Sequence, residues 1–388
     1  METLLPPEIE TEILLRLPSK SLQRFTSVCK SWHSLISSCF FIHSYHSRTF
    51  LNPQLFLLKH PLSDPLLPSS LTTIHFSLSS DSLLDLSSFK VPQEPTSHSE
   101  FLRPTGVELV TSNSINGIVC VLVYMGVHTE IVINCDLFLW NPSTSESVKI
   151  PSSEITGLFS GPPMVKFYCG FGTGLYCEDY KVVRIVYPHS DHAIVEVYSL
   201  RENCWRRLDL ISRSGILSNI LWASLSCTFV DGVGHWGAFR RERKDKFFVL
   251  GFDFGTECFK KIKVPVECVD GREMRYHSLW VYKGSLAISV LRFGEFESKI
   301  TRHYIWVMMN ENNWFKLFNI DLVGGPRRPI ATLGNGELLL LGYGDDGEHA
   351  LYDPELEEVK WVMVDISDVN AAVSYVESLV SLSQLMPK

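Results

Sequence analysis

The feature that most constrains this fold is a pattern that recurs five times between residues 137 and 362. In each copy a short apolar strand is followed by a polar turn and by a second strand rich in aromatic and basic residues. Equivalent positions lie 58, 54, 55 and 45 residues apart, at Trp140, Tyr198, Phe252, Val307 and Tyr352. A weaker sixth copy is present at residues 74–86. Periods of this length are typical of repeated supersecondary units.

A second recurring signal marks the turns within each repeat. The dipeptides Asn116-Gly117, Asp231-Gly232, Lys283-Gly284 and Asn335-Gly336 each precede an apolar strand. Glycine suits these positions because tight hairpin turns require positive φ. Each unit therefore holds about four short strands, which is typical of propeller blades. We expect a mainly-β, propeller-like body of about six blades over residues 71–388, with a β-sandwich as the alternative.

The first 45 residues have a different character. Eighteen apolar residues fall between Leu4 and Ile42, in three short helical patterns. A module of roughly 40 residues cannot bury so much apolar surface alone, and surplus apolar surface usually marks a docking site. We therefore expect a small all-α head of three helices at 1–45 that completes its core against another chain. Residues 46–70 are interpreted as a connector, in which 54–58 suit an edge strand.

Charge and cysteine content exclude several classes. Residues 1–60 carry six basic and four acidic residues, and the remainder carries 29 and 39, so a basic face for nucleic acid is not expected. The first residues lack a positive n-region, and the longest apolar run is too short to span a bilayer. Ten scattered cysteines without a CxxC pair fit reduced thiols better than disulfides or zinc ligands. We expect a cytoplasmic and/or nuclear protein without a cofactor, metal or membrane partner.

Motifs for chemistry are weak. Residues 170–174, Gly-Phe-Gly-Thr-Gly, look like a phosphate-binding loop, but the third glycine of a dinucleotide site is missing and no Gly-Lys-Ser/Thr follows. We interpret them as a loop before a strand at 181–187. The charge run at 240–246 is interpreted as a solvated hairpin tip, with a nuclear signal or an acidic-partner contact as alternatives. No GxSxG elbow is present, so no catalytic residue is predicted.

Several motifs resemble a known family. Leu5-Pro6-Pro7-Glu8-Ile9, the run from Glu12 to Leu22, Val28-Cys29-Lys30-Ser31-Trp32 and Leu35-Ile36 resemble the F-box of plants. The body is similar to the plant F-box-associated domain at residues 114–120, 139–144, 170–172 with 179–184, 306–317 and 375–382. Within that group the chain is similar to both the S-locus F-box and the F-box/kelch-repeat branches.

The resemblance implies a function without catalysis. An F-box binds a Skp-type adaptor and, through it, the cullin and RING subunits of an SCF-type E3 ubiquitin ligase. The body would then capture a protein substrate for ubiquitination and proteasomal degradation. A self-incompatibility ribonuclease and an immune receptor are both candidate substrates. A β-propeller enzyme and a non-ligase interaction scaffold remain alternative functions.

The resemblance and the apolar stripes together place the expected adaptor-binding residues in the head. They are Leu5, Pro6, Ile9, Ile13, Leu14, Leu17, Pro18, Leu22, Val28, Cys29, Trp32, Leu35 and Ile36. The substrate is expected to contact the longer segments of the body. These are residues 152–165, 172–179, 211–220, 240–246 and 291–300.

Overall fold

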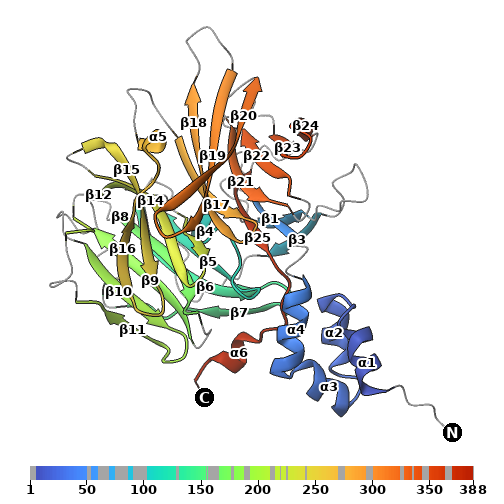
Figure 1. The fold of residues 1–388 in the computed structure, drawn as a ribbon. Helices are drawn as coiled ribbons and strands as arrows, with labels where there is room; N and C mark the ends of the chain where they lie inside the picture. Colours follow the sequence, from blue (N-terminus) through green and yellow to red (C-terminus); the bar gives the residue numbers. More distant parts are fainter. Residues whose placement is uncertain are drawn as a thin grey trace.

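The computed structural model has a helical head joined to a body of antiparallel sheets, with the head beside β7 and α6 (Figure 1). It describes residues 6–49, 54–59, 70–74, 86–90, 103–127, 131–153, 155, 166–175, 179–187, 193–209, 215–218, 220–223, 226–240, 243–269, 276–293, 300–323, 327–333, 336–342, 349–362 and 369–387. Within these ranges, no helix has both the length and the apolar character needed to cross a membrane.

The head begins with the three helices that the sequence predicts. They are α1 (Pro7–Leu14), α2 (Ser19–Phe25) and α3 (Lys30–Ile36). Proline in the first turn of α1 costs no hydrogen bond, and Glu8 and Glu10 place negative charge at the positive end of the helix dipole. Pro18 then precedes α2 in an extended conformation, which separates the first two helices.

A fourth helix, α4 (Cys39–Thr49), follows, so the expectation of three helices was wrong. Its apolar pattern is weak because histidine and serine alternate with the apolar residues. Only Phe41 and Tyr45, one turn apart, are buried. The tertiary contacts of these two rings, rather than a strong amphipathic stripe, therefore account for this helix.

Five sheets of the body are built from strands that follow one another in the chain. The first contains β4 (Arg103–Leu109), β5 (Val119–Val127), β6 (Ile131–Asn141) and β7 (Glu146–Lys149). The second contains β8 (Lys166–Thr173), β9 (Tyr180–Tyr187), β10 (Ile194–Ser199) and β11 (Cys204–Arg207). The third contains β12 (Ile220–Ala223), β13 (Thr228–Val230), β14 (Val233–Arg240), β15 (Arg243–Asp253) and β16 (Cys258–Ile262).

The remaining continuous sheets repeat this order. The fourth contains β17 (Tyr276–Tyr282), β18 (Ser285–Phe293), β19 (Ile300–Asn310) and β20 (Asn313–Val323). The fifth contains β21 (Arg327–Thr332), β22 (Leu338–Gly342), β23 (His349–Asp353) and β24 (Glu358–Val362). Two short helices, α5 (Val266–Val269) and α6 (Leu382–Leu385), complete the described elements.

A composite sheet joins the two ends of the body. It contains β25 (Val369–Tyr375), β1 (Gln54–Lys59), β2 (Ser70–Ile74) and β3 (Leu86–Lys90), in that order. The expected edge strand at 54–58 is therefore wrong, because β1 pairs with β2 on one side and β25 on the other. The expectation of about six blades is corrected to five continuous blades and this composite sheet. The weak sixth repeat at 74–86 lies mostly outside the described residues.

The predicted tight turns are present at the end of the body that carries the head. Asn116-Gly117, Asp231-Gly232 and Lys283-Gly284 all have positive φ at both residues. A second set of positive-φ residues occupies the turn before the outer strand of each continuous blade: Ser145, Asn203, Glu257, Asn312 and Glu357. In a four-stranded antiparallel sheet, the turn between the first two strands and the turn between the last two strands lie at the same end.

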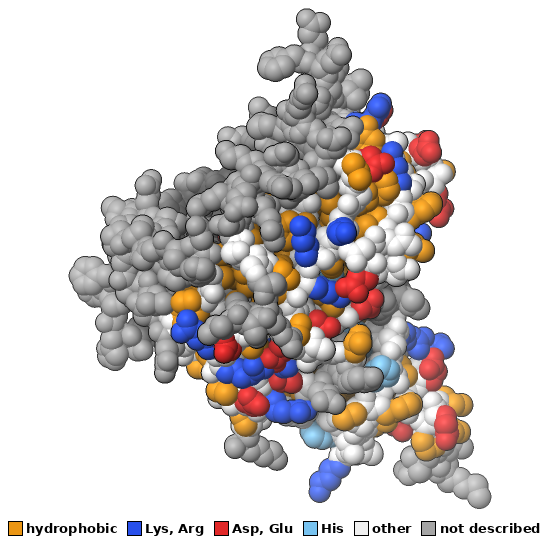
Figure 2. Space-filling model, turned by 60° about the vertical axis from the view of Figure 1, so that its left-hand side comes forward, with side chains coloured by type: hydrophobic (Ala, Val, Ile, Leu, Met, Phe, Trp, Pro, Cys, Tyr) orange, Lys and Arg blue, Asp and Glu red, His pale blue; other side chains and the backbone are white. Residues whose placement is uncertain are grey.

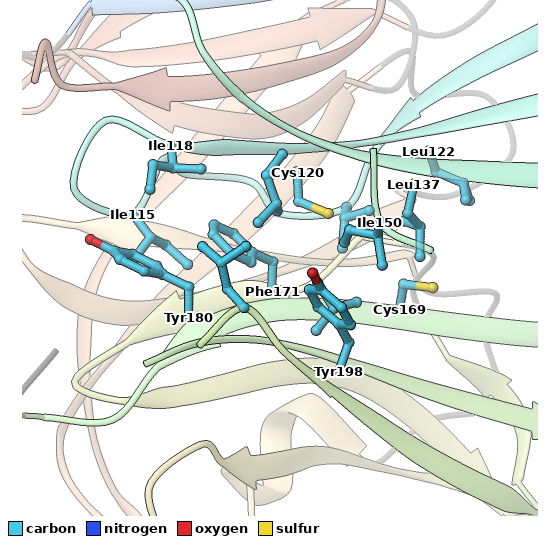
Figure 3. Close-up of a cluster of buried hydrophobic side chains, with 14 of the residues drawn as sticks. Ile115, Ile118, Cys120, Leu122, Leu137, Ile150, Cys169, Phe171, Tyr180 and Tyr198 are labelled. Atoms are coloured by element: carbon cyan, nitrogen blue, oxygen red, sulfur yellow. The ribbon is translucent and has the colours of Figure 1, made fainter. Parts of the chain in front are cut away.

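Neighbouring blades pack face to face. The largest cluster of buried side chains lies between the first and second sheets, where Cys120 and Leu139 meet Phe171, Val182 and Tyr198 (Figure 3). Each blade therefore buries its faces against its neighbours, as expected for repeated units that are stable only together.

Residues 170–173 form part of β8, so their interpretation as a loop was wrong. The two glycines make room for aromatic rings of the third sheet. A Cβ atom at Gly170 would lie 2.4 Å from Trp236, and one at Gly172 would lie 2.3 Å from Phe254. Close packing between blades, rather than phosphate binding, thus explains this glycine pattern.

Residues 110–114, here called the crossbar, connect three sheets. The backbone of Val110 and Ser112 bonds to Cys227 beside β13, and Ser112 and Ser114 bond to Ser374 in β25. The Asn113 side chain donates to the Phe229 carbonyl over 3.0 Å and accepts from its N–H over 3.1 Å. The crossbar therefore ties the first sheet to the third sheet and to the composite sheet.

Candidate functional site

Three of the predicted adaptor-binding residues form the core of the head. Leu14, Leu22 and Ile36 are buried together with Phe41 and Tyr45 of α4. Their side chains are not available to a partner in this conformation. The apolar surplus of the head is therefore divided between an internal core and an external surface.

Three further predicted residues, Leu17, Trp32 and Leu35, are partly buried against this core. The ring of Trp32 lies 5.1 Å from that of Phe25, and its Nε1 donates to the carboxylate of Glu10. Trp32 thus holds α3 against α1 and α2, which makes it first of all a structural residue of the head.

The remaining described candidates are exposed. They are Pro6, Ile9, Ile13, Pro18, Val28 and Cys29; Leu5 lies outside the described residues. Ile9, Ile13 and Val28 expose 49%, 47% and 62% of their surface. Ile9 and Ile13 are four residues apart on α1 and share one face of it. They form the apolar surface that the head leaves uncovered.

Phe40, at the start of α4, is 71% exposed and was missed as a site residue. The sequence shows Phe40 only as one of two adjacent phenylalanines, and this pair alone does not predict which of the two rings faces the core. Figure 2 shows hydrophobic side chains exposed on the head, which lies at the lower right of that view. We call Ile9, Ile13, Val28 and Phe40 the head surface.

Cys29 caps α3 beside this surface. Its Sγ accepts the Trp32 backbone N–H over 3.4 Å and lies 3.1 Å from the Ser31 hydroxyl. The Ser31 hydroxyl, followed by the Trp32 N–H, lowers the pKa of the Cys29 thiol. Cysteine therefore replaces the usual serine or aspartate cap and fixes the chain direction after Val28.

Charged residues join the first and last helices of the head. The carboxylate of Glu12 in α1 accepts from Arg16 over 3.0 Å and from Arg48 of α4 over 2.9 Å. The hydrogen bonds from Arg48 and then Arg16 lower the pKa of Glu12. All three side chains are solvent-exposed, so this network contributes orientation more than stability.

The segment from the last residue of β25 to the first residue of α6 runs between head and body, and we call these residues, 375–382, the strap. The Glu377 carboxylate accepts from the Tyr45 hydroxyl over 2.8 Å and from the Ser19 backbone N–H over 3.4 Å. Leu379 is buried in the core of the head, in the cluster that also contains Leu14. A segment that follows the whole body in sequence thus completes the head.

The body holds the other side of the strap. The Asn141 amide donates to the carbonyls of Ser378 over 3.1 Å and Val380 over 2.7 Å. Tyr375, at the start of the strap, is hydrogen-bonded to Ser143 in the turn between β6 and β7. Two of the motifs on which the resemblance rests, 139–144 and 375–382, therefore contact each other.

An open groove lies beside the strap, between the head and the β6–β7 turn. It is lined by Gln23, Thr26, Ile36, Ser37, Ile42, Thr144, Glu146, Leu379, Ser381 and Gln384. Across the described ranges, no cluster of three or more His, Cys, Asp or Glu side chains is arranged to hold a metal ion.

Parts of the expected substrate segments lie outside the described residues, namely 154, 156–165, 176–178, 211–214, 219, 241–242 and 294–299. The strands that flank 152–165, 211–220, 240–246 and 291–300 place these connections at the end of the body opposite the head. Segment 172–179 instead connects β8 to β9 at the head end. Arg240 ends β14 and residues 243–246 begin β15, with Arg240 opposite Arg243. The predicted hairpin is therefore present, but most of the charge run belongs to its strands rather than to its tip.

The start of segment 152–165 is held firmly on the second sheet. The Trp205 Nε1 donates to the Pro151 carbonyl over 2.6 Å. The Ser153 hydroxyl bonds to Glu196 over 2.9 Å and to Arg184, and the Arg184–Glu196 ion pair is itself buried. This connection therefore leaves the body from a fixed base.

A helical head with an uncovered apolar surface, joined to a β-propeller, defines a two-module binding protein. The F-box domain family matches residues 3–44, and the family described as F-box associated beta propeller domain matches residues 73–360. The chain belongs to the F-box proteins that carry this propeller domain. The resemblance inferred from the sequence motifs is therefore confirmed.

The chain is similar to F-box proteins of Arabidopsis thaliana. The chain is 28% identical to F-box/kelch-repeat protein At3g23880, over 98% of this chain and 96% of that protein. It is 23% identical to F-box protein CPR1, over 93% and 82% of the two chains. Among solved structures, the β-propeller domain of the Trilobed protease from Pyrococcus furiosus matches 70% of this chain and 73% of its own, at 11% identity and a TM-score of 0.40.

Proposed function

We propose that this chain is the substrate-recognition subunit of an SCF-type E3 ubiquitin ligase. In this proposal the head binds a Skp-type adaptor, which links it to the cullin and RING subunits. The body captures a protein substrate for ubiquitination and proteasomal degradation. The chemistry is performed by the conjugating enzyme, and this chain contributes proximity between a substrate lysine and the ubiquitin thioester.

The observation that carries the proposal is the exposed head surface in a chain of the F-box family. Ile9, Ile13, Val28 and Phe40 remain exposed although the head has a complete core. A surface of large apolar side chains favours association with a partner, since burial removes it from water. We therefore assign the adaptor contact to these residues, with Pro6, Pro18 and Cys29 at its border.

For the substrate, we propose the end of the body opposite the head. Four of the five candidate segments are bordered by strand ends on that side of the body, and segment 172–179 is the one bordered by strand ends on the head side. Long connections on a rigid frame are where binding residues concentrate. Because β1 belongs to the composite sheet, we place the start of this body at β1 rather than after a connector ending at residue 70. A self-incompatibility ribonuclease and an immune receptor are the candidate substrates to test.

The free thiols of Cys29, Cys39 and Cys204 are exposed, which supports action in a reducing compartment, the cytoplasm or nucleus. A propeller enzyme would need acids or metal ligands near the ring centre. The observation that supports the binding function instead is the exposure of Ile9, Ile13, Val28 and Phe40 on the head.

The adaptor contact is tested with a purified Skp-type adaptor and the full-length chain. Ile13→Glu and Val28→Glu should each weaken binding by about 2 kcal/mol, roughly 30-fold, because each places a charge in an apolar contact. Isothermal titration calorimetry measures the affinity. Val266→Glu and Leu356→Glu are matched controls, since these body residues are exposed to a similar degree, 71% and 62%.

Equal affinity of the head variants and the body controls would contradict the assignment of the surface. No binding by the unmodified chain would contradict the proposed function itself. Affinity purification followed by mass spectrometry, with the unmodified chain as bait, separates the ligase from the scaffold alternative and identifies the captured substrate.

A further inference from the structure

The head and the body are connected at two places. The first is the covalent passage from α4 to β1. The second is the strap, which leaves β25 and passes into the head 332 residues after Tyr45 in the sequence. A single covalent link would permit rotation, which is the default between domains. A second attachment at a separate point removes that freedom.

The strap is bound on both sides by buried groups. On the head side, Thr49 donates to the Glu377 carbonyl over 2.9 Å, and the Tyr45 hydroxyl donates to its carboxylate. Burial, followed by the negative charge of Glu377, raises the pKa of Tyr45, so its hydroxyl keeps its proton. The Tyr45–Glu377 hydrogen bond therefore persists across the physiological pH range.

On the body side, the strap is fixed at both of its ends. The Val376 N–H donates to the Ser114 hydroxyl over 3.0 Å. The Glu146 carboxylate accepts from the Ser381 hydroxyl over 2.9 Å and from the backbone N–H of Leu382. Leu382 itself is fully buried in the cluster between the first two sheets. Leu379 thus reaches the head from a segment that cannot slide along the body.

We propose that Glu377 and Leu379 are positioning residues that fix the orientation of the head relative to the propeller. This inference rests on the proposed function for its consequence. With the head held by an adaptor, the opposite end of the body faces one direction, at one distance from the conjugating enzyme. Rigid presentation raises the effective concentration of a substrate lysine there.

The test is a distance measurement between labels on the head and the body of the full-length chain. Cys39 of the head and Cys204 of the body are exposed and take spin labels, with Cys29, Cys177 and Cys258 replaced by serine. Pulsed electron paramagnetic resonance then measures the distribution of distances between the two spin labels. We call the contacts of Tyr45, Glu377 and Leu379 between head and body the joint. When the joint is unmodified, the distances between the labels should form one narrow distribution. The double variant Tyr45→Phe/Leu379→Ala should widen it about twofold, because the head regains rotation about one link.

A matched control separates positioning from general destabilisation. Tyr187 donates to the Leu217 carbonyl over 3.0 Å within the second and third sheets, and Leu217 is buried to a similar degree as Leu379. Tyr187→Phe/Leu217→Ala therefore removes the same groups away from the joint. It should leave the distance distribution narrow.

Because Leu379→Ala also opens the core of the head, Glu377→Gln and Tyr45→Phe are measured singly as well. Helicity by circular dichroism confirms that the head stays folded in each. Narrow distributions in all joint variants, or equal widening in the control pair, would overturn the proposal. Adaptor binding is scored separately by titration of the unmodified chain. Failure of that chain to bind the adaptor contradicts the proposed function, whereas unchanged distances in the joint variants contradict the proposal about Glu377 and Leu379.

Discussion

At the scale of single residues, buried polar groups make the fold sensitive to pH. His235 in β14 is 2% exposed, and its Nδ1 lies 3.1 Å from the Thr228 carbonyl. A carbonyl only accepts, so this nitrogen carries the proton of the neutral ring. Burial lowers the pKa of His235 to about 4, against the smaller opposite effect of that hydrogen bond.

This pKa predicts lower stability in mild acid. The unfolded state takes up a proton below about pH 6.5, whereas folded His235 stays neutral down to about pH 4. Stability therefore falls as the pH falls through this window, by about 2 kcal/mol from this residue between pH 7 and pH 5. Urea unfolding at several pH values should show a shallower pH dependence for His235→Gln. His33→Gln, at an exposed site, serves as the control, and an unchanged slope in both would contradict the assignment.

The identity of the apolar residues in the head could be predicted, but their direction could not. The positions of Ile9, Ile13 and Leu14 in α1 are equally consistent with a buried or an exposed side chain. In the structure Leu14 belongs to a buried cluster that also contains Leu379, whereas Ile9 and Ile13 are exposed. No sequence pattern within the head predicts that the side chain of Leu379, from the other end of the chain, packs into its core.

At the scale of elements, the turn between β4 and β5 does two things at once. Gly117 has φ +75°, and a Cβ atom there would lie 2.2 Å from the Cβ of Ser378 in the strap. Gly284, in the equivalent turn of the fourth sheet, has φ +82° with no atom within 4 Å of a Cβ. The two glycines share a conformation and differ in their surroundings.

This pair predicts a difference in stability. Gly284→Ala should cost about 1 kcal/mol, the strain of alanine in the left-handed region. Gly117→Ala should cost roughly 2 kcal/mol more, because the strap must also move. Chemical denaturation of the two variants measures both values. Equal losses would mean that the strap does not rest tightly against this turn.

The turns themselves were predictable from the sequence, and the role of their partners was not. Asn-Gly and Asp-Gly dipeptides before apolar strands indicate positive φ whatever the tertiary fold. By contrast, Asn141 and Ser143 look like ordinary turn residues. Their hydrogen bonds to the strap involve residues more than 230 positions away. The role of the β8 glycines was likewise not predictable, because they leave room for the rings of Trp236 and Phe254, which are distant in the sequence.

At the scale of the whole molecule, the repeat predicted the propeller but not its closure. Five copies of the pattern correspond to five continuous sheets. The composite sheet matches only the weak copy at residues 74–86, and its strands β25 and β1–β3 come from opposite ends of the body. Similarity between neighbouring segments does not reveal a pairing between distant ones.

This closure predicts the effect of a truncation. A chain ending after Val362 lacks both β25 and the strap, so the composite sheet loses a strand and the head loses Leu379. It should show no single cooperative thermal transition, since repeated units depend on their neighbours. Circular dichroism melts check this, with a chain ending after Met386 as the control. A transition like that of the full chain in the shorter protein would contradict the prediction.

The strap has a consequence for how the protein is made. Glu377 and Leu379, which complete the head, follow all five continuous blades in the sequence, so they are translated after the helices of the head. Domains generally fold in the order of their synthesis, but this head cannot complete its core until the strap has been made. The contacts that join the head to the body therefore form last.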